Sequence, residues 1–444
     1  MTTAQESEEL TRVGPGTLMG EFMRQYWIPA AMSDELAADG VPMRLMLLGE
    51  KLVAFRDSDG RVGVMDHRCP HRCASLFFGR NEESGLRCIY HGWKFDTEGN
   101  CVDMPNLRGD QDFKHKVKAK AYPAAERNGL IWVYMGKRRP APPLPPLEVN
   151  LLPREQVQMK FIQRECSWLQ SLEGDIDTSH FGFLHVGSVD PDDVPLDHPI
   201  RGAVLHRSPD YNFREMPFGT QYGAFRPADD GRTYWRFANF LFPFWTQQPQ
   251  GSFPTHVGAR AWVPMDDTHT MFVHLQWEPE HLRKKLTAVA PLKNGGTLPG
   301  SRPDHDFLPN GTGWFDRWRL AANADNDYQI DREAQARNEI FSGITDIHLQ
   351  DQAVTESMGD IVDHTFEHLA PSDQMITRTR RHLLRQARAF RDTGQTPPGV
   401  DDPEILLQAR AGFFVADPAT DWEQAYAEQV EKAERPASDM KAAE

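Results

Sequence analysis

The sequence contains little cysteine and no long hydrophobic run. Five cysteines in 444 residues are too few for a disulfide framework, so a reducing compartment with metal-binding thiolates is the better interpretation. No apolar stretch approaches the roughly 20 residues that span a bilayer. The acidic N-terminus lacks the hydrophobic segment of a secretory signal. We therefore expect a cytoplasmic protein with no membrane contact.

The sequence is also short of basic residues. Its 49 Lys and Arg against 64 Asp and Glu give a formal net charge of −15 at pH 7. Nucleic-acid phosphates and anionic lipids repel such a chain, so we expect neither as a partner. The composition, with 39% hydrophobic and 25% charged residues, is ordinary for a soluble globular protein. A chain of this length is expected to form two or more hydrophobic cores.

The first 135 or so residues are predicted to be mostly β. Aromatic and β-branched residues are dense in several short runs, which is typical of strands. The turns Asp57–Gly60 and Thr97–Asn100 have the composition of hairpin connections. The predicted strands are Arg44–Leu48, Leu52–Phe55, Val62–Met65, Trp93–Asp96 and Gly129–Tyr134.

A proline-rich segment separates this part from the rest of the chain. Five prolines occupy seven positions between Pro140 and Pro146, which favours an extended polyproline II conformation and marks the best domain boundary. Beyond it, Trp235–Phe242 and Thr270–Trp277 are predicted strands. Residues 290–325 are rich in Gly, Pro, Asn and Asp and are predicted to form a long loop, a candidate lid.

The last part of the chain is predicted to be mainly helical. Helical composition begins near Asp331, with a long helix near Arg378–Phe390. The final stretch, Trp422–Glu444, is rich in Ala, Glu and Lys and is expected to form a peripheral helix that frays. Strands followed by mixed strands and helices predict an α+β fold.

Two matched pairs of metal-binding residues lie in the β part. Cys69-Pro70-His71 and Cys88-Ile89-Tyr90-His91 are separated by 16 residues. Two Cys and two His can bind zinc, and a structural zinc site is the direct alternative. Each pair, however, offers one thiolate and one imidazole, which suits a Rieske [2Fe–2S] centre in which two Cys hold one iron and two His the other.

A second group of metal-binding residues follows the proline-rich segment. Asp177, His180 and His185 stand at spacings of three and five. Imidazoles and carboxylates suit a non-haem ferrous ion, which needs one further carboxylate here. A spacing of five puts two side chains about 140° apart on a regular α-helix. Because Gly182 lies between the histidines, we predict a helix end or a π-type distortion that brings both onto one face.

At these residues the chain resembles a known family. Cys69–Asp96 is similar to the cluster-binding region of Rieske non-haem iron oxygenases, and most similar to the phthalate-dioxygenase-like branch that includes aryl O-demethylases. The resemblance covers nearly the whole chain. It implies that Cys69, His71, Cys88 and His91 hold the [2Fe–2S] cluster. It also implies that the remaining cysteines, Cys73, Cys101 and Cys166, are small buried residues.

The resemblance also completes the iron site. His180 and His185 match the family's two iron-ligating histidines, and Asp351, within Leu349–Gly359, matches its ligating carboxylate. Nearby acidic residues are expected to be surface or capping residues: Asp346, Asp360 and Asp363. The chain departs from related sequences at Asp363-His364, where those often have Asp-Arg; this leaves the ligands intact but puts local packing in doubt.

The family's architecture sets the expected domains. Residues 1–26 form an N-terminal arm, 27–138 an all-β Rieske [2Fe–2S] domain, and 139–150 a proline-rich linker. Residues 151–420 form an α+β catalytic domain of helix-grip type, as in START and Bet v1-like proteins. Residues 421–444 form a peripheral helix and tail.

The resemblance implies the terminal oxygenase component of a multicomponent system. Electrons from NAD(P)H would pass through a reductase, directly or through a ferredoxin, to the cluster and then to a mononuclear Fe(II) where O₂ is activated. The expected reaction is hydroxylation or cis-dihydroxylation of an aromatic carboxylate. O-demethylation of a methoxylated aromatic acid, with formaldehyde release, is the alternative. A Rieske electron carrier and a zinc-stapled binding protein are more distant ones.

Asp177 has an implied role between subunits. In the family the matching carboxylate links an iron-ligating histidine to a cluster histidine of a neighbouring chain, so Asp177 is expected to bridge His180 to His91 of the partner subunit, within a homotrimer or two stacked trimers. An ordinary carboxylate within one subunit is the alternative.

The sequence alone leaves the substrate contacts open. Any of four arginines could bind a substrate carboxylate, and each could equally be a surface residue: Arg207, Arg226, Arg236 and Arg260. Six aromatic residues could line a cavity or belong to the core: Phe181, Phe183, Phe240, Phe242, Phe244 and Trp245.

Overall fold

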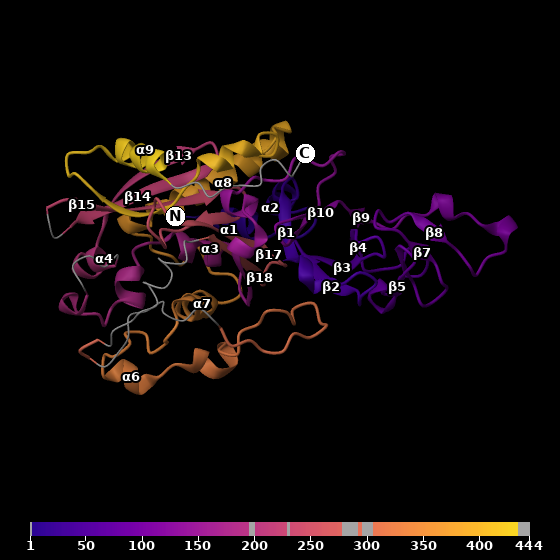
Figure 1. Ribbon diagram of the computed structural model, residues 1–444, viewed down its shortest axis with the longest axis horizontal. Helices are drawn as coiled ribbons and strands as arrows, with labels where there is room; N and C mark the ends of the chain where they lie inside the picture. Colours follow the sequence, from indigo (N-terminus) through magenta and orange to yellow (C-terminus); the bar gives the residue numbers. More distant parts are fainter. Residues whose placement is uncertain (1, 195–199, 229–230, 278–291, 295–304, 434–444) are drawn as a thin grey trace.

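The chain folds into a small all-β domain and a larger α+β domain that lie at opposite ends of an elongated molecule (Figure 1). The computed structural model describes residues 2–194, 200–228, 231–277, 292–294 and 305–433. The expected α+β class, with an all-β N-terminal part, is confirmed. Within the described ranges, no helix combines the length and the apolar character that a membrane span needs.

Two short helices precede the small domain. Thr3 and Thr17 begin them, because each threonine hydroxyl accepts a hydrogen bond from a backbone N–H of the first turn. Both helices pack against a long helix of the larger domain, α8 (Gln374–Thr393), so the N-terminal arm belongs spatially to that domain. The helices are α1 (Ala4–Thr11) and α2 (Leu18–Met23).

The small domain, residues 27–134, contains three antiparallel sheets, and the predicted strands are confirmed. The first sheet has the order β1 (Trp27–Met32), β11 (Leu130–Tyr134), β10 (Ala124–Arg127). The second is β2 (Met43–Leu47), β3 (Glu50–Arg56), β4 (Val62–Asp66), β9 (Ala121–Tyr122). The third is β5 (Arg80–Glu82), β6 (Gly85–Arg87), β7 (Lys94–Phe95), β8 (Cys101–Asp103).

The larger domain is built on an antiparallel sheet. Its order is β12 (Gln158–Arg164), β18 (Thr270–Trp277), β17 (Val257–Pro264), β16 (Trp245–Gln247), β15 (Thr233–Leu241), β14 (Gly219–Pro227), β13 (Asp210–Met216), with β19 (Gly412–Ala416) also paired to β15. Its helices are α3 (Trp168–Ile176), α4 (Arg201–Leu205), α6 (Arg332–Ala336), α7 (Ile347–Ser357), α8 (Gln374–Thr393) and α9 (Trp422–Lys432).

Helices cover both faces of this sheet. Helix α8 packs on β14, and α3 packs on β16 and β17. On the other face, Tyr426 of α9 packs against Trp235 and Phe237 of β15. Because successive side chains of a strand point to opposite faces, residues of even number in β14 and β15 face α3 and α8. A long helix packed against one face of an antiparallel sheet agrees with the expected helix-grip arrangement. Residues 434–444 of the predicted tail lie outside the described residues.

The predicted loop over residues 290–325 is fastened to the small domain where the structure describes it. Residues 290–291 and 295–304 lie outside the described residues. Within 305–323, the Arg317 guanidinium holds both carboxylate oxygens of Glu35 at 2.6 Å, and Nε1 of Trp318 donates to Glu35 at 3.2 Å. Arg44 donates to the carbonyl of Thr312 at 2.6 Å. This part of the loop therefore joins the two domains.

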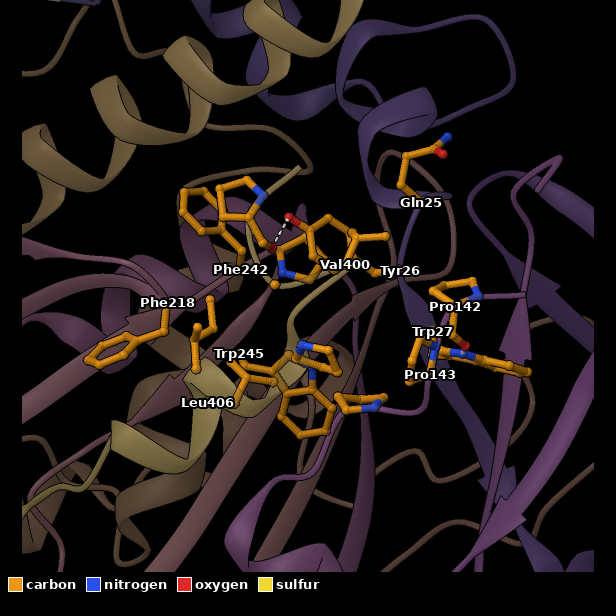
Figure 2. Close-up of a pocket in the computed structure, with 16 residues that line it drawn as sticks. Gln25, Tyr26, Trp27, Pro142, Pro143, Phe218, Phe242, Trp245, Val400 and Leu406 are labelled. Carbon is orange, nitrogen blue, oxygen red and sulfur yellow. Dashed lines mark hydrogen bonds between the residues drawn. The ribbon is translucent and has the colours of Figure 1, made fainter. Parts of the chain in front are cut away.

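The joint between the domains is filled by side chains. Figure 2 shows Tyr26 and Trp27, prolines of the linker and Phe242 and Trp245 around a small cavity, whose volume of about 20 Å³ holds roughly one water molecule. Tyr26 donates to the carbonyl of Pro398 at 2.9 Å, and Trp27 to that of Pro142 at 2.7 Å. Phe242 and Trp245 thus belong to the domain joint rather than to a substrate cavity.

Candidate metal centres and active site

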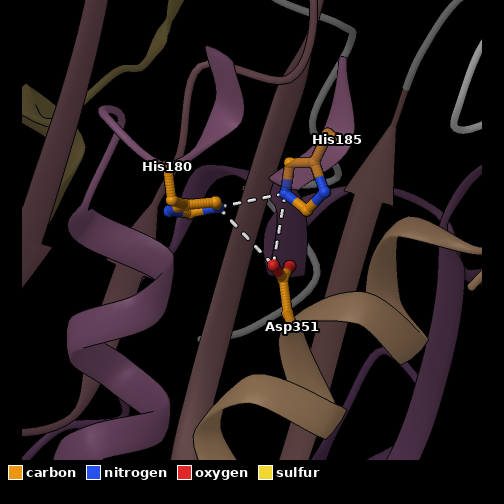
Figure 3. Close-up of side chains that lie close together, drawn as sticks. All are labelled: His180, His185 and Asp351. Atoms are coloured by element: carbon orange, nitrogen blue, oxygen red, sulfur yellow. Dashed lines mark hydrogen bonds and ion pairs between the residues drawn. The ribbon is translucent and has the colours of Figure 1, made fainter. Parts of the chain in front are cut away.

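Three side chains from two elements converge on one point in the larger domain. Nε2 of His180 lies 3.0 Å from Nε2 of His185, and Oδ1 of Asp351 lies 3.5 and 3.2 Å from these nitrogens. Figure 3 shows both rings and the carboxylate pointing toward one another. The histidines follow α3, whereas Asp351 projects from α7. The structure therefore brings together His180, His185 and Asp351, the residues that the family resemblance implied as iron ligands.

The predicted distortion between the two histidines is present. Residues Phe181–His185 form a single π-helical turn, directly after His180. The wider turn brings side chains five positions apart onto one face, which a regular α-helix cannot do. Gly182 lets the turn pack closely against Arg207, because a Cβ atom there would lie 3.1 Å from Cβ of Arg207 and 3.2 Å from its carbonyl oxygen.

The electrostatics of the three groups are linked. Burial lowers the pKa of His180, but the carboxylates of Asp177 and Asp351 outweigh burial and raise it to about 10. Burial raises the pKa of Asp351, yet the two imidazoles hold that pKa well below its usual range. Two imidazoles and an ionised carboxylate, with their donor atoms gathered within 4.8 Å, fit a non-haem ferrous ion.

Asp177 contacts His180 from the other side of the ring. Its Oδ2 lies 3.4 Å from Nδ1 of His180, and its Oδ1 accepts a hydrogen bond from the backbone N–H of Ser179 at 2.7 Å. The carboxylate is partly exposed, with 24% of the side-chain surface accessible. It therefore faces solvent and the ring of His180 rather than the point where the other three groups meet.

Gln350 is a contact that the sequence analysis missed. Its side-chain oxygen lies 2.6 Å from Nδ1 of His185, and its side-chain nitrogen donates to the carbonyl of Ile344 at 2.6 Å. The residue stands directly before Asp351 on α7 and is buried. No sequence motif indicated Gln350 as a residue of the site, because a glutamine in a helix is usually a surface residue. Asp346, in contrast, begins α7 as the expected capping residue.

A second group of possible ligand atoms belongs to a different arrangement. Glu173, His364 and Glu367 lie together, and Nη2 and Nη1 of Arg380 contact the two glutamates at 2.6 Å each. The positive charge that the carboxylates need is thus supplied by Arg380. His364, at the position where the chain departs from related sequences, is buried and contacts Oγ of Ser7 at 2.7 Å. His364 therefore helps to attach the N-terminal arm to the larger domain.

The loops of the small domain gather the two Cys–His pairs. Cys69 and Cys88 are buried in one apolar cluster, and burial raises the pKa of the Cys69 thiol to about 12. The rings of His71 and His91 lie 4.4 Å apart, and Trp93 stacks on His71 at 4.3 Å. Nδ1 of His91 is buried and has no hydrogen-bond partner among the described residues. Two thiols and two imidazoles, one of which has this unpartnered nitrogen, fit a [2Fe–2S] cluster.

The other cysteines divide into two kinds. Cys101 and Cys166 are buried, as expected, and burial raises the pKa of each thiol to about 11. Cys73 is exposed, so the expectation that it is a buried residue is wrong. It ends a turn, with φ of 59° and its N–H donating to the carbonyl of Cys69 at 2.9 Å, and its side chain lies on the surface of the cluster loop.

Comparison with known proteins decides the family. Residues 26–123 match the family of Rieske [2Fe-2S] domains, and residues 133–444 match the family described as LigXa C-terminal domain like. A 3-chlorobenzoate-3,4-dioxygenase oxygenase subunit from Comamonas testosteroni is 50% identical over 97% of this chain and 99% of its own length. The chain belongs to the Rieske oxygenases, as an oxygenase subunit. It is therefore an oxidoreductase.

Further similarities of this Rieske oxygenase subunit agree with its fold. A phthalate 4,5-dioxygenase oxygenase subunit from Pseudomonas putida is 34% identical over 95% of this chain and 94% of its own length. A crystal structure of dicamba monooxygenase bound to 3,6-dichlorosalicylic acid superposes with a TM-score of 0.54 at 16% identity. It covers 84% of this chain and 99% of that one, and at this identity it shows the shared fold alone.

The structure separates the four candidate arginines of the oxygenase subunit. Arg260 forms an ion pair with Asp175, and Arg207 donates to the carbonyl of Gly187 at 3.2 Å. Arg226 is only 2% exposed, and its three guanidinium nitrogens have no hydrogen-bond partner in the described part of the chain. Burial and the positive charge of Arg236 lower the pKa of Arg226 to about 10.

Arg236 connects this region to the iron site. It lies on β15, beside Arg226 on β14, and both side chains face the α3 side of the sheet. The Arg236 guanidinium lies 4.8 Å from the centre of the Phe181 ring, and that ring lies 5.5 Å from the ring of His185. Arg236 is therefore separated from His185 by about one aromatic side chain.

Proposed function

We propose that this subunit uses O₂ and NAD(P)H-derived electrons to hydroxylate or cis-dihydroxylate an aromatic carboxylate. The observation that carries the proposal is the convergence of His180, His185 and Asp351 in a chain that also has a Rieske domain. These three residues hold a mononuclear iron. The [2Fe–2S] cluster is held by Cys69, His71, Cys88 and His91. A reductase, acting directly or through a ferredoxin, is the electron-supplying partner, because the related proteins are oxygenase subunits of multicomponent systems.

The chain's own residues bind and orient the reactants. When bound, the cluster supplies single electrons and the iron activates O₂. Asp351 would hold the iron together with His180 and His185 and would supply the negative charge of the site. The ring of Phe181, 5.5 Å from the ring of His185, supplies an apolar wall beside that site. Such a wall excludes water from the reacting atoms.

The proposal includes electron transfer between subunits. In Figure 1 the cluster-bearing strands β5 to β8 lie at one end of the molecule, away from α3 and α7. Ile89 and Tyr90, between two cluster ligands, are 62% and 54% exposed, which favours a surface covered by another protein. Asp177 is partly exposed beside His180, so it is placed to reach His91 of the partner subunit. A homotrimer, or two stacked homotrimers, would bring Asp177 of one subunit close to His91 of the partner subunit.

Two buried arginines support a carboxylate substrate. A guanidinium that is buried without a partner costs roughly several kcal/mol. A substrate carboxylate that accepts two parallel N–H bonds from Arg226 removes this cost, with Arg236 adding a second positive charge. The relatives are named for 3-chlorobenzoate and phthalate, both aromatic carboxylates. The ring of such a substrate would then lie against Phe181, on the side of the iron-site histidines.

O-demethylation of a methoxylated aromatic acid remains the second candidate. It uses the same metal ligands and the same carboxylate contact, because hydroxylation of a methoxyl carbon differs from ring hydroxylation only in which carbon faces the iron. The two outcomes are separated by product, since only O-demethylation releases formaldehyde.

The proposal is tested with a panel of aromatic acids. The purified subunit, loaded with iron and supplied with NADH and a surrogate reductase, is followed for O₂ uptake, product mass and formaldehyde. Uptake of O₂ coupled to hydroxylated product supports ring oxidation, and formaldehyde supports the second candidate. Two irons per chain and no substrate-dependent O₂ uptake would indicate an electron carrier instead.

The domain bounds and the location of the protein belong to the same proposal. The division at 26, 138, 150 and 420 stays part of the proposal: the two matched families end and begin at 123 and 133, so the proposed linker, residues 139–150, falls within the second match. A cytoplasmic location is proposed because the NAD(P)H-dependent reductase operates there.

A further inference from the structure

We infer that Gln350 is a positioning residue for the iron site: it fixes the ring of His185 so that Nε2 faces the metal. This inference rests on the proposed iron site and goes beyond it, because it concerns a residue that is no metal ligand. A ligating histidine must present one ring nitrogen without a proton, and the partner of the other nitrogen decides which one that is.

The contacts of Gln350 determine the orientation of its amide. Its side-chain nitrogen lies 2.6 Å from the carbonyl oxygen of Ile344, and only the amide N–H can serve a carbonyl oxygen. The amide oxygen therefore faces Nδ1 of His185 at 2.6 Å and must accept a hydrogen bond. Nδ1 of His185 thus carries a proton, which leaves Nε2, the nitrogen on the side of Asp351 and His180, to bind a metal.

Burial makes this arrangement rigid. Gln350 is 1% exposed and the side chain of His185 is 2% exposed, so water cannot replace either partner. Loss of the amide would leave a buried N–H of His185 and a buried carbonyl unpaired, which disfavours the present ring orientation. His180 differs, because 25% of its side chain is exposed and its Nδ1 faces a carboxylate, Asp177, at a longer 3.4 Å. The two ligands are therefore held by unlike partners.

Helix α7 couples two parts of the site. Asp351 and Gln350 are consecutive residues of this helix, so one backbone segment supplies both a ligand and the residue that orients another ligand. A neutral amide does this without adding a negative charge next to Asp351. Metal affinity should therefore depend on Gln350 through the geometry of His185.

The test measures Fe(II) binding by protein whose mononuclear site has been emptied and whose [2Fe–2S] cluster is intact. Three variants are compared with the wild type: Gln350→Met, Gln350→Glu and, as a matched control, Gln352→Met. Gln352 lies on the same helix and is 3% exposed, but its amide bonds to Glu356 and to the carbonyl of Gln163. Bound Fe(II) is quantified anaerobically from the EPR signal of its nitric oxide adduct, which the oxidised cluster does not obscure.

Gln350→Met is expected to weaken Fe(II) binding roughly 10–100-fold, the usual loss when a residue that orients a metal ligand is removed. Gln350→Glu keeps an acceptor for Nδ1 and should retain affinity within about threefold, with the shape of the EPR signal preserved. Gln352→Met should bind Fe(II) as the wild type does, even where its melting temperature falls. Wild-type affinity in Gln350→Met, or an equal loss in Gln352→Met, would overturn the inference. Failure of the wild type to bind Fe(II) would overturn the iron site itself.

Discussion

Oδ2 of Asp177 lies 3.4 Å from Nδ1 of His180, on the side of the ring turned away from Asp351. The carboxylate can therefore orient the ring without occupying the metal position. Because Asp177 ends α3 and remains partly exposed, the same carboxylate is open to a group of another molecule. This relationship leads to the first of five predictions.

Asp177→Asn should keep both metals and lose electron transfer between them. The amide preserves the size of the side chain but removes the negative charge that would link His180 to His91 of the partner subunit. We expect transfer from cluster to iron to slow roughly 10–100-fold. Iron and sulfide analysis checks the metals, and single-turnover oxidation of the reduced cluster measures the rate. Cluster oxidation at the wild-type rate would contradict the bridge.

Asp351→Ala should remove one metal centre and spare the other. The substitution takes away the only carboxylate of the triad, whereas the cluster ligands lie in the small domain. We expect iron per chain to fall from about three to about two, with the visible spectrum of the cluster unchanged. A variant that keeps all its iron would show that the mononuclear site lies elsewhere.

Arg226→Gln should weaken binding of aromatic acids but not of their amides. The variant loses a charge-assisted contact of the kind that contributes about 1.5–3 kcal/mol, so the KM for an aromatic acid that the subunit oxidises should rise roughly 10–100-fold. The neutral amide of the same acid should bind as it does to the wild type. Arg214→Gln, on the face of the sheet that carries Trp422, is the matched control. Equal losses for the acid and the amide would exclude a carboxylate contact at Arg226.

His256 should make the fold less stable in acid. Burial and the positive charges of Arg260 and Arg410 lower the pKa of His256 to about 3, from an ordinary 6.5. The fold therefore keeps the neutral ring, and the stability that this provides is complete above pH 6.5 and decreases as the pH falls toward 3. At pH 5 the loss should be about 2 kcal/mol.

Thermal unfolding at pH 7.5 and pH 5 checks this contribution. His256→Leu has no group to protonate at that position, so its melting temperature should fall less between the two pH values than that of the wild type. The same decrease in both proteins would place the acid sensitivity at other residues.

Arg317→Leu should loosen the attachment between the domains. Its ion pair with Glu35 is largely buried, with 10% and 13% of the two side chains exposed. Removing one partner of a buried pair leaves a charge without compensation and costs about 3–5 kcal/mol. The melting temperature should fall, and the double variant Arg317→Leu with Glu35→Gln should recover part of the loss. A double variant no more stable than the single one would assign the effect to lost packing.

Much of the fold follows from short-range patterns, and these predictions are confirmed. The hairpin strands around Asp57–Gly60 and the strands β15 and β18 follow from strand-forming residues bounded by turn residues. The π-helical turn follows from a spacing of five with Gly182 between the histidines. Each of these depends on residues that are close in sequence.

The remaining features depend on contacts between distant segments. Glu35 and Arg317 are 282 positions apart, and nothing near either residue indicates the other. Asp351 was assigned to the site only through the family resemblance, because its helix lies far from the histidines in sequence. From the sequence alone, each of the four arginines could equally bind a substrate carboxylate. Strand register and burial then distinguish Arg226 from the others. Gln350 acquires its contact only when α7 is placed against the π-helical turn.

Because residues 305–323 are bound to the small domain, not every exchange of domains between this enzyme and its relatives will give a matched pair. A chimaera that exchanges only the first 138 residues would set Arg317 and Trp318 of one parent against a foreign residue at position 35. The exchangeable module is therefore discontinuous, consisting of residues 27–138 together with residues 305–323. Grafting a new electron-accepting domain onto this catalytic domain requires both pieces to come from the same parent.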